Sequence, residues 1–256
     1  MRLGVLGWPV AHSRSPAMHT AAFAALGLVG WRYQRLPVPP EAFAETVRAL
    51  PAAGFAGANV TVPHKEAALA LADTASDDAR AIGAANTLTF GPQGTIHADN
   101  TDAPGLLDAL PEPPGGRTAL VLGAGGSARA AAYALSRAGA RVAVHNRTAA
   151  RARALGEDLG VTAVDGPTAA DILVNCTTVG LQDPEATPVA GVKPYGTVVD
   201  LVYRPGGTAL ANAARAAGLP TVDGLEILVR QGARSLEIWT GREAPLEAMR
   251  LAAADG

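Results

Sequence analysis

The stretch Val121-Leu122-Gly123-Ala124-Gly125-Gly126-Ser127-Ala128 joins a short apolar run to the start of a helical pattern. Its small residues fit the spacing G-x-G-x-x-[GA], with alanine in the last position. Gly123 permits a tight turn, and Gly125 lets backbone N–H groups approach a pyrophosphate at the helix N-terminus. Glycines at this spacing also occur in simple tight turns. Because a strand precedes these and a helix and a second strand follow, the stretch predicts a dinucleotide-binding βαβ unit.

The residues around this stretch continue the alternation of apolar runs and helical periodicity. Strands are expected at 118–122, 141–145, 172–176, 197–201 and 220–222, and helices at 127–138, 148–159 and 209–217. Strands that alternate with helices form parallel sheets with right-handed crossovers. We therefore predict a Rossmann-type, doubly wound parallel sheet in the second half of the chain.

The first half shows the same alternation and predicts a separate α/β domain. Strands are expected at 2–7, 31–38 and 57–62, helices at 15–26, 40–50 and 65–72, and a hairpin at 87–90 and 95–98. In the first helix, Ser15 is the expected N-cap and Pro16 the first helical residue, where its missing N–H costs nothing. We predict domains at 1–102 and 103–224, with the turn-rich stretch 111–116 just inside the second, and a segment at 225–256 whose long helix, 226–240, returns to the first domain.

The end of the second strand of the βαβ unit indicates which dinucleotide binds. Proteins that bind NAD usually place Asp or Glu there, as a partner for the ribose 2′-hydroxyl. This chain has Asn146-Arg147-Thr148, with Arg151 one turn further on. No carboxylate repels a 2′-phosphate, and both arginines can bind that anion. The alternative is a solvated helix start with exposed arginines; the pattern favours NADP.

The composition excludes several classes of protein. Of 256 residues, 48% are hydrophobic and 17% charged, and the formal net charge is −2. This balance gives no electrostatic footprint for nucleic acid or anionic lipid, and no run reaches the roughly 18 apolar residues of a membrane helix. The single cysteine, Cys176, forms no internal disulfide, and the N-terminus resembles a signal peptide only faintly, so we expect a cytoplasmic protein. No histidine has metal-ligand spacing, and we expect no metal.

Polar segments of the first half lie where α/β folds bind ligands. His12-Ser13-Arg14-Ser15-Pro16 places two hydroxyls at a helix N-terminus, which suits a carboxylate, whereas capping alone explains Ser15 but not Ser13. Asn59-Val60-Thr61-Val62-Pro63-His64-Lys65 ends a strand and delivers Lys65 to the sheet edge. Taken alone, Lys65 would be read as a solvated surface lysine. Two further polar clusters are Gly83-Ala84-Ala85-Asn86-Thr87 and Asp99-Asn100-Thr101-Asp102.

Together these segments resemble the shikimate dehydrogenase family. The family motifs S-x-S-P, N-V-T-V-P-H-K, I-G-A-x-N-T, N-T-D-x-x-G, G-A-G-G-x-x-R, N-R-T and D-x-x-Y-x-P occur in family order between Gly7 and Gln231. The resemblance implies a two-domain α/β enzyme that reversibly reduces 3-dehydroshikimate to shikimate with NADP, a step of chorismate and aromatic amino acid biosynthesis. It implies small-molecule ligands without nucleic acid or membrane, and a monomer or homodimer.

The resemblance also implies roles for individual residues. Lys65 and Asp102 match the catalytic pair of the family. The expected substrate-binding residues are Ser13, Ser15, Thr61, Asn86, Tyr203 and Gln231. The expected cofactor-binding residues are Gly123, Ala124, Gly125, Gly126, Ser127, Ala128, Asn146, Arg147, Thr148, Arg151, Thr177, Leu201 and Gly224. Two positions differ from the residues that are frequent in the family. Arg14 places a large charged side chain at the variable middle position of S-x-S, and Ile227 stands where methionine is frequent.

Three alternatives stay open at this point. A quinate/shikimate dehydrogenase would accept a broader range of substrates or cofactors. A tetrahydrofolate-linked dehydrogenase shares the architecture but has no need for two serines that bind a carboxylate. A sensor that binds NADP without turnover would not need Lys65, Asp102 and Tyr203, because the fold alone does not fix the function.

Overall fold

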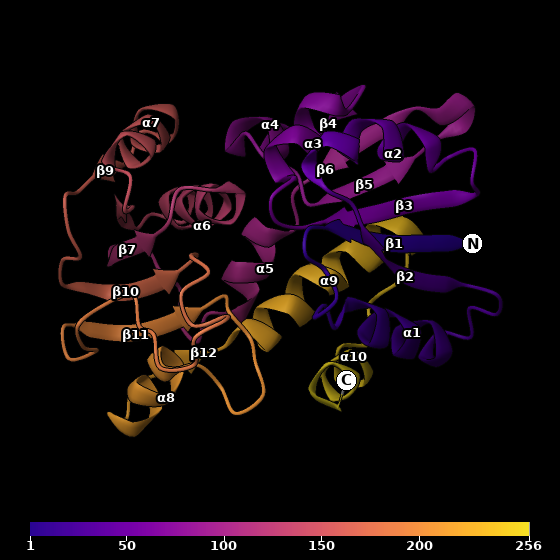
Figure 1. The fold of residues 1–256 in the computed structure, drawn as a ribbon. Helices are drawn as coiled ribbons and strands as arrows, with labels where there is room; N and C mark the ends of the chain where they lie inside the picture. Colours follow the sequence, from indigo (N-terminus) through magenta and orange to yellow (C-terminus); the bar gives the residue numbers. More distant parts are fainter. Residues whose placement is uncertain (256) are drawn as a thin grey trace. The chain divides into compact units, whose positions relative to one another are not determined.

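The computed structural model describes residues 1–255 of the chain, which form two compact units (Figure 1). Unit 1 comprises Met1–Gly105 and Leu228–Gly256, and unit 2 comprises Leu106–Ile227. These divisions fall close to the predicted boundaries at 102/103 and 224/225. Each unit has its own six-stranded sheet, so the α/β fold class predicted from the alternation is confirmed.

Unit 1 is built on a mixed sheet, sheet A, in the order β2-β1-β3-β5-β6-β4. Its strands are β1 (Arg2–Gly7), β2 (Arg32–Pro37), β3 (Phe55–Val60), β4 (Thr74–Ala75), β5 (Thr87–Phe90) and β6 (Ile96–Asp99). The strands β1, β2 and β3 are parallel, whereas β5 runs antiparallel to β3 and β6. The C-terminal ends of β3 and β6 and the start of β5 therefore share one edge of the sheet.

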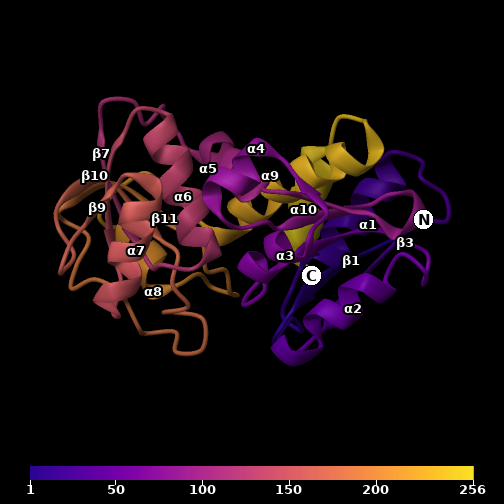
Figure 2. The same cartoon turned by 90° about the horizontal axis from the view of Figure 1, so that it is seen from above.

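Helices cover both faces of sheet A because its strands alternate side chains between two apolar layers. Figure 2 shows α2 (Phe43–Ala49) on one side and α1 (Ser15–Ala25), α9 (Gly224–Thr240) and α10 (Leu246–Asp255) on the other. On the first side, Phe43 and Val47 of α2 pack with Leu6 and Val60 of the strands. The remaining helices are α3 (Lys65–Leu71), α4 (Asp77–Ile82) and two 3-10 turns, Pro40–Ala42 and Pro92–Gly94.

Unit 2 is a doubly wound sheet, sheet B, and all of its strands are parallel. The order is β12-β11-β10-β7-β8-β9, which corresponds to the 3-2-1-4-5-6 order of dinucleotide-binding folds. The strands are β7 (Thr118–Leu122), β8 (Arg141–His145), β9 (Thr162–Ala163), β10 (Ala170–Asn175), β11 (Tyr195–Asp200) and β12 (Thr221–Val222). The helices that connect these strands are α6 (Gly126–Arg137), α7 (Ala149–Leu159) and α8 (Ala209–Ala216), and α6 and α8 lie far apart in Figure 1 with β10 and β11 between them.

The structure corrects the sequence reading of several elements. The first helix begins at Ser15, with Arg14 as N-cap and no side-chain capping bond, so the prediction that Ser15 caps it is wrong. The sequence prediction contains no element at α5 (Asp102–Ala109), a helix that holds Pro104 in its first turn, where proline is tolerated. It also missed the short elements β4, α4 and β9 and the terminal helix α10. No helix within residues 1–255 combines the length and apolarity needed to span a membrane.

Candidate functional site

Lys65 is the first residue of α3, where the chain turns away from the edge of sheet A. Its Nζ lies 2.5 Å from Oδ2 of Asp102, and only 9% of Lys65 is exposed. The preceding residue fixes this turn, because Nε2 of His64 lies 2.7 Å from the carbonyl oxygen of Val38 and its ring stacks on Phe43. The ammonium of Lys65 is thus held in one place by a buried anchor and a charged partner.

Asp102 begins α5 after the end of β6. The side-chain oxygen of Asn100 accepts hydrogen bonds from the backbone N–H groups of Asp102 (3.1 Å) and Ala103 (3.2 Å) and so caps this helix start. Oδ1 of Asp102 accepts a hydrogen bond from Nδ2 of Asn86 at 2.9 Å. One carboxylate oxygen therefore faces Lys65, and the other is fixed by an amide.

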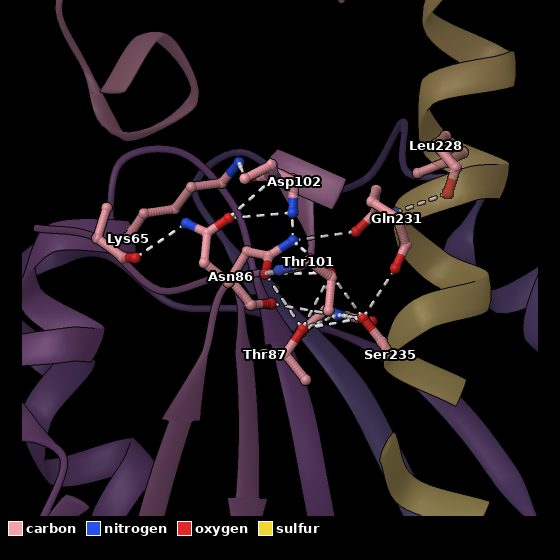
Figure 3. A network of polar contacts seen from close by, with 12 residues as sticks. Lys65, Asn86, Thr87, Thr101, Asp102, Leu228, Gln231 and Ser235 are labelled. Atoms are coloured by element: carbon pink, nitrogen blue, oxygen red, sulfur yellow. Dashed lines mark hydrogen bonds and ion pairs between the residues drawn. The ribbon is translucent and has the colours of Figure 1, made fainter. Parts of the chain in front are cut away.

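Asn86 joins this pair to a buried polar network (Figure 3). Its side-chain oxygen accepts a hydrogen bond from the backbone N–H of Thr101 at 2.7 Å, which sets the orientation of the amide. Nδ2 also donates to Oε1 of Gln231 at 3.2 Å, and Nε2 of Gln231 donates to the carbonyl of Leu228 at 2.7 Å. The structure thus brings together four residues that the sequence singled out: Lys65, Asn86, Asp102 and Gln231.

Below these residues lie four others to which the sequence analysis assigned no role. Ser235 on α9 is fully buried, and its Oγ accepts a hydrogen bond from Nδ2 of Asn59 at 2.8 Å. The hydroxyls of Thr87 and Thr101 lie 2.9 and 3.0 Å from the same Oγ. We call Asn59, Asn86, Thr87, Thr101 and Ser235 the sheet A network. Asn59, Thr87 and Thr101 lie inside the sequence motifs quoted above. The only sequence signal for Ser235 is its position one helical turn after Gln231.

Ser13 and Ser15 lie between β1 and α1, and both are buried, with exposed fractions of 5% and 4%. The Oγ of Ser13 accepts a hydrogen bond from the backbone N–H of Ser15 at 3.3 Å. Within residues 1–255, neither hydroxyl donates a proton to a protein acceptor, so both O–H groups remain able to donate to a ligand. Thr61 follows β3, and its methyl group packs close to Gly7. A Cβ added to Gly7 would lie only 2.5 Å from that methyl carbon.

In unit 2 the glycine turn has the geometry that a dinucleotide needs. Gly123 has φ of +113°, and a Cβ there would lie 3.2 Å from the carbonyl oxygen of Cys176. A Cβ on Gly125 would meet nothing within 4 Å, which leaves open space beside the start of α6. The N-cap residue Gly125 makes no side-chain hydrogen bond to α6, and helix N-termini are favourable places for anions. This turn also contains Ala124, Gly126, Ser127 and Ala128.

Arg147 and Arg151 flank the start of α7, and both are exposed. Nδ2 of Asn146 donates to the carbonyl of Thr148 at 3.0 Å and shapes this turn. Among residues 1–255, no carboxylate forms an ion pair with either guanidinium. Two exposed cations without an acidic partner at a helix start suit a phosphate group, as the sequence predicts for NADP.

A second buried network lies where β10 and β11 end side by side. Asn175 and Asp200 are register partners, and Nδ2 of Asn175 donates to Oδ1 of Asp200 at 2.9 Å. The carboxylate also accepts hydrogen bonds from the N–H of Val202 at 3.1 Å and the hydroxyl of Thr208 at 2.6 Å. The other end of Asn175 accepts from the hydroxyl of Thr177 at 2.7 Å. We call Asn175, Thr177, Asp200 and Thr208 the sheet B network.

This network holds loops that carry predicted ligand-binding residues. Asp200 starts the loop that contains Leu201 and Tyr203, and Asn175 fixes Thr177. Nη1 of Arg204 donates to the carbonyl of Gly180 at 3.2 Å and ties the two loops together. Gly224 follows β12, and a Cβ there would lie 2.6 Å from the carbonyl oxygen of Leu201, so only glycine fits. Burial raises the pKa of Asp200 even though all three hydrogen bonds oppose that shift.

Comparisons with known proteins agree with these two regions. The family model described as the shikimate dehydrogenase substrate binding domain matches residues 5–88. The model described as shikimate / quinate 5-dehydrogenase matches residues 112–178, and that of the shikimate 5'-dehydrogenase C-terminal domain matches residues 224–253. The chain is 50% identical to the NADP(+) shikimate dehydrogenase of Methylobacterium radiotolerans, over 94% of this chain and 91% of that protein.

Two solved structures extend the comparison. Shikimate 5-dehydrogenase from Thermus thermophilus, in complex with NADP(H) and shikimate, has a TM-score of 0.92 at 45% identity and covers 100% of this chain and 99% of its own. The ligand-free 5-ketofructose reductase of a Gluconobacter strain has a TM-score of 0.86 at 33% identity, with coverage of 100% and 98%. Proteins of this fold therefore include one whose named substrate carries no carboxylate.

Proposed function

Because this chain belongs to the shikimate dehydrogenase family, we propose that it catalyses the reversible NADP-dependent reduction of 3-dehydroshikimate to shikimate, with Lys65 and Asp102 as its acid–base pair. The chain is an oxidoreductase that acts on a CH–OH group, and NADP is its cofactor, as the sequence predicts. The observation that supports the roles of the pair is the 2.5 Å contact between Nζ of Lys65 and Oδ2 of Asp102, held in place by Asn86.

The residues of unit 2 suit the cofactor. The open space at Gly125 and the uncapped start of α6 fit a pyrophosphate, and Arg147 with Arg151 fits the 2′-phosphate. Bound NADPH supplies a hydride for the substrate carbonyl carbon. We propose that Ala124, Thr148, Thr177, Leu201 and Gly224 line this binding site.

The residues of unit 1 supply the proton and hold the substrate. As the carbonyl carbon gains a hydride, negative charge develops on its oxygen, and the Lys65 ammonium stabilises that charge and donates a proton to it. In the oxidation direction, neutral Lys65 would take the hydroxyl proton while the hydride passes from the carbon to oxidised NADP. The Asp102 carboxylate keeps Nζ in position in both directions.

Specificity for this substrate comes from two kinds of polar contact. The Ser13 and Ser15 hydroxyls donate to the carboxylate, and Asn86 and Gln231 bind ring hydroxyls, with Thr61 and Tyr203 on the ring side. A site built for hydroxyls rejects analogues that lack them, because its own buried groups then stay unpaired. Quinate and 5-ketofructose are therefore the informative rival substrates.

The direct test measures the absorbance of reduced nicotinamide when purified protein is mixed with shikimate, quinate or fructose, the reduced form of 5-ketofructose, each with NADP and with NAD. We expect the highest turnover with shikimate and NADP. Comparable rates with quinate or NAD would establish the broader quinate/shikimate activity, and turnover of fructose alone would contradict the role of the two serines. No turnover at all would support a sensor that binds NADP.

The proposal also includes a cytoplasmic enzyme that works as a monomer or homodimer without nucleic acid or membrane. Light scattering of the eluate from a sizing column, across a range of protein concentrations, measures the oligomeric state. A larger assembly would contradict this part of the proposal without affecting the chemistry.

A further inference from the structure

Arg14, the middle residue of the Ser13-Arg14-Ser15 loop, has no part in the proposed function, yet its side chain has a defined target. Nη1 of Arg14 donates to the carbonyl oxygens of Ala253 at 3.1 Å and Ala254 at 3.3 Å. Both carbonyls belong to the last turn of α10, which packs beside α1 in Figure 1. The last carbonyls of a helix lack partners within the helix and carry partial negative charge, so a guanidinium stabilises them.

A second arginine holds the same loop from the other side. Arg35 projects from β2, and its Nε and Nη2 both donate to the carbonyl oxygen of Ser13, at 3.0 and 2.6 Å. The peptide that joins Ser13 to Arg14 is therefore fixed by one guanidinium at its carbonyl, and the next side chain is fixed by a helix end. Neither contact involves a serine hydroxyl.

What the two arginines hold is a pair of buried hydroxyl donors. The backbone N–H of Ser15 is already engaged with Oγ of Ser13, whereas both O–H groups have no acceptor within residues 1–255. Because the backbone between them is restrained on two sides, the hydroxyls need little reorganisation when a ligand arrives. Such preorganisation increases affinity by reducing the entropy lost on binding.

We propose that Arg14 and Arg35 form a clamp that positions the Ser13 and Ser15 hydroxyls for the substrate carboxylate, so that the terminal helix α10 is part of the carboxylate site. This rests on the proposed function, in which the two serines bind that carboxylate. Arg14 and Arg35 are positioning residues, because the side-chain hydrogen bonds of both run to backbone carbonyls. Their loss should weaken recognition of the carboxylate and leave the acid–base pair intact.

The test compares Arg14→Leu and Arg35→Leu with a matched control, Arg242→Leu. Arg242 makes the same kind of bond at another helix end, because its Nη1 donates to the carbonyl of Leu26 at 3.0 Å, just after α1. We expect each clamp variant to raise KM for shikimate about three- to tenfold, with kcat within about twofold and KM for NADP unchanged. The control should leave all three constants unchanged, although its thermal stability falls by a similar amount.

A second readout separates positioning from general destabilisation. Shikimate methyl ester lacks the charged carboxylate, so the preference of the wild-type enzyme for shikimate over the ester should shrink in both clamp variants and stay constant in Arg242→Leu. Arg14→Lys should restore most of the preference, because an ammonium also donates to helix-end carbonyls, whereas Arg14→Gln should restore less. If a leucine variant fails to fold, the comparison of Lys with Gln at position 14 decides the question.

The proposal is overturned if the clamp variants behave like the control in both KM and ester preference. Two other results would indicate failure of the proposed function itself and not of the clamp. Either the wild-type enzyme does not turn over shikimate, or Ser13→Ala leaves KM for shikimate unchanged.

Discussion

The two units use buried polar groups in opposite ways at the edges of their sheets. The sheet A network consists of neutral amides and hydroxyls, and its charges lie above it in the Lys65–Asp102 pair. The sheet B network has a carboxylate, Asp200, at its centre, and the three donors that bind it are all neutral. Under the proposed function, unit 1 therefore keeps its charge where a substrate binds, whereas unit 2 uses a charge to hold its loops.

The same contrast appears in how the two cores respond to acid. In unit 1, His19 is fully buried and stacks on Tyr33 at 4.3 Å, and neither ring nitrogen has a hydrogen-bond partner. Burial lowers the pKa of His19 to about 3, and the nearby Asn59 side chain opposes this shift without cancelling it. In unit 2, burial raises the pKa of Asp200, and Asp223 adds repulsion. Acidification should therefore destabilise unit 1 through His19 and stabilise unit 2 through Asp200.

The largest expected effect concerns the charged pair of unit 1. Lys65→Ala removes the proton donor, and general acid–base catalysis typically contributes about 10²–10⁴ in rate, so kcat should fall by that amount. KM for shikimate should change less than about tenfold, because the serines and amides still bind it. Steady-state kinetics with Asp171→Asn as the control completes the comparison, since Asp171 is an exposed carboxylate of unit 2 that contacts Thr118 and none of the predicted ligand-binding residues. Normal turnover in Lys65→Ala would remove the distinction between the two regions.

The second prediction concerns His19 and acid. The unfolded histidine binds a proton below its ordinary pKa of 6.5, whereas the folded one stays neutral down to about pH 3. Between these two pKa values the unfolded state binds more protons, so the free energy of unfolding falls as pH falls. The decrease is about 1.4 kcal/mol per pH unit and roughly 4–5 kcal/mol between pH 6.5 and about pH 3. His19→Phe keeps the ring stack and should remove this contribution to the slope of stability against pH.

Fluorescence isolates the unit concerned, because the three tryptophans of the chain, Trp8, Trp31 and Trp239, all lie in unit 1. Urea unfolding followed by tryptophan emission between pH 7 and pH 4 gives the slope for wild type and variant. If wild type and His19→Phe gave parallel slopes, the pKa of His19 would be the same in the folded and unfolded states.

The features that sequence alone predicts are those encoded within one short segment. Gly123 and Gly125 stand in a contiguous turn, and Lys65 follows a strand, so local pattern placed these residues at sheet edges. The pairing of Lys65 with Asp102 came only from the resemblance to a family. The features that it misses depend on contacts between distant segments. Ser235 meets Thr87 across 148 positions, and Arg14 meets Ala253 across 239, distances that no local pattern encodes.

Local rules also failed where two of them competed. Ser15 followed by Pro16 reads as a capping residue, but the chain starts α1 one residue earlier, with Arg14 at the cap. The serine hydroxyl is thereby released from capping, which is the state a ligand-binding group needs. The sequence prediction has no helix at α5, where the cap from Asn100 and the position of Pro104 in the first turn allow one.

The third prediction tests how much stability unit 2 derives from its carboxylate. Asp200→Ala leaves Asn175, Val202 and Thr208 without their acceptor, and each buried unpaired group costs about 1–3 kcal/mol. We expect unit 2 to lose roughly 3 kcal/mol or more in urea unfolding followed by circular dichroism. Asp200→Asn, which keeps one acceptor oxygen, should lose less. The exposed Asp171 accepts hydrogen bonds from Thr118 near the opposite edge of sheet B, and Asp171→Ala should have a smaller effect.

The contribution of Asp200 to stability depends on pH with the opposite sign to that of His19. A carboxyl whose folded pKa is raised contributes stability at low pH, and this contribution is lost as pH rises from 3.8 through the raised value. Asp200→Asn does not titrate, so its stability relative to wild type should fall as the solution is acidified. A constant difference between the two across this range would contradict a raised pKa at Asp200.

The smallest expected effect is at the centre of the sheet A network. Ser235→Ala removes one acceptor of the Asn59 amide, but Nδ2 of Asn59 keeps the carbonyl of Asn86 at 3.1 Å and the hydroxyl of Thr87 at 3.2 Å. Because the neutral network is redundant, we expect a loss of only about 1 kcal/mol and kcat within about twofold. Thr240→Ala is the matched control, since Thr240 donates to the carbonyl four residues earlier on α9, as Ser235 does, but lies outside the network. A loss at Ser235 as large as that of Asp200→Ala would mean that a neutral network is no more tolerant than a charged one, and the contrast between the two units would then reside only in the Lys65–Asp102 pair.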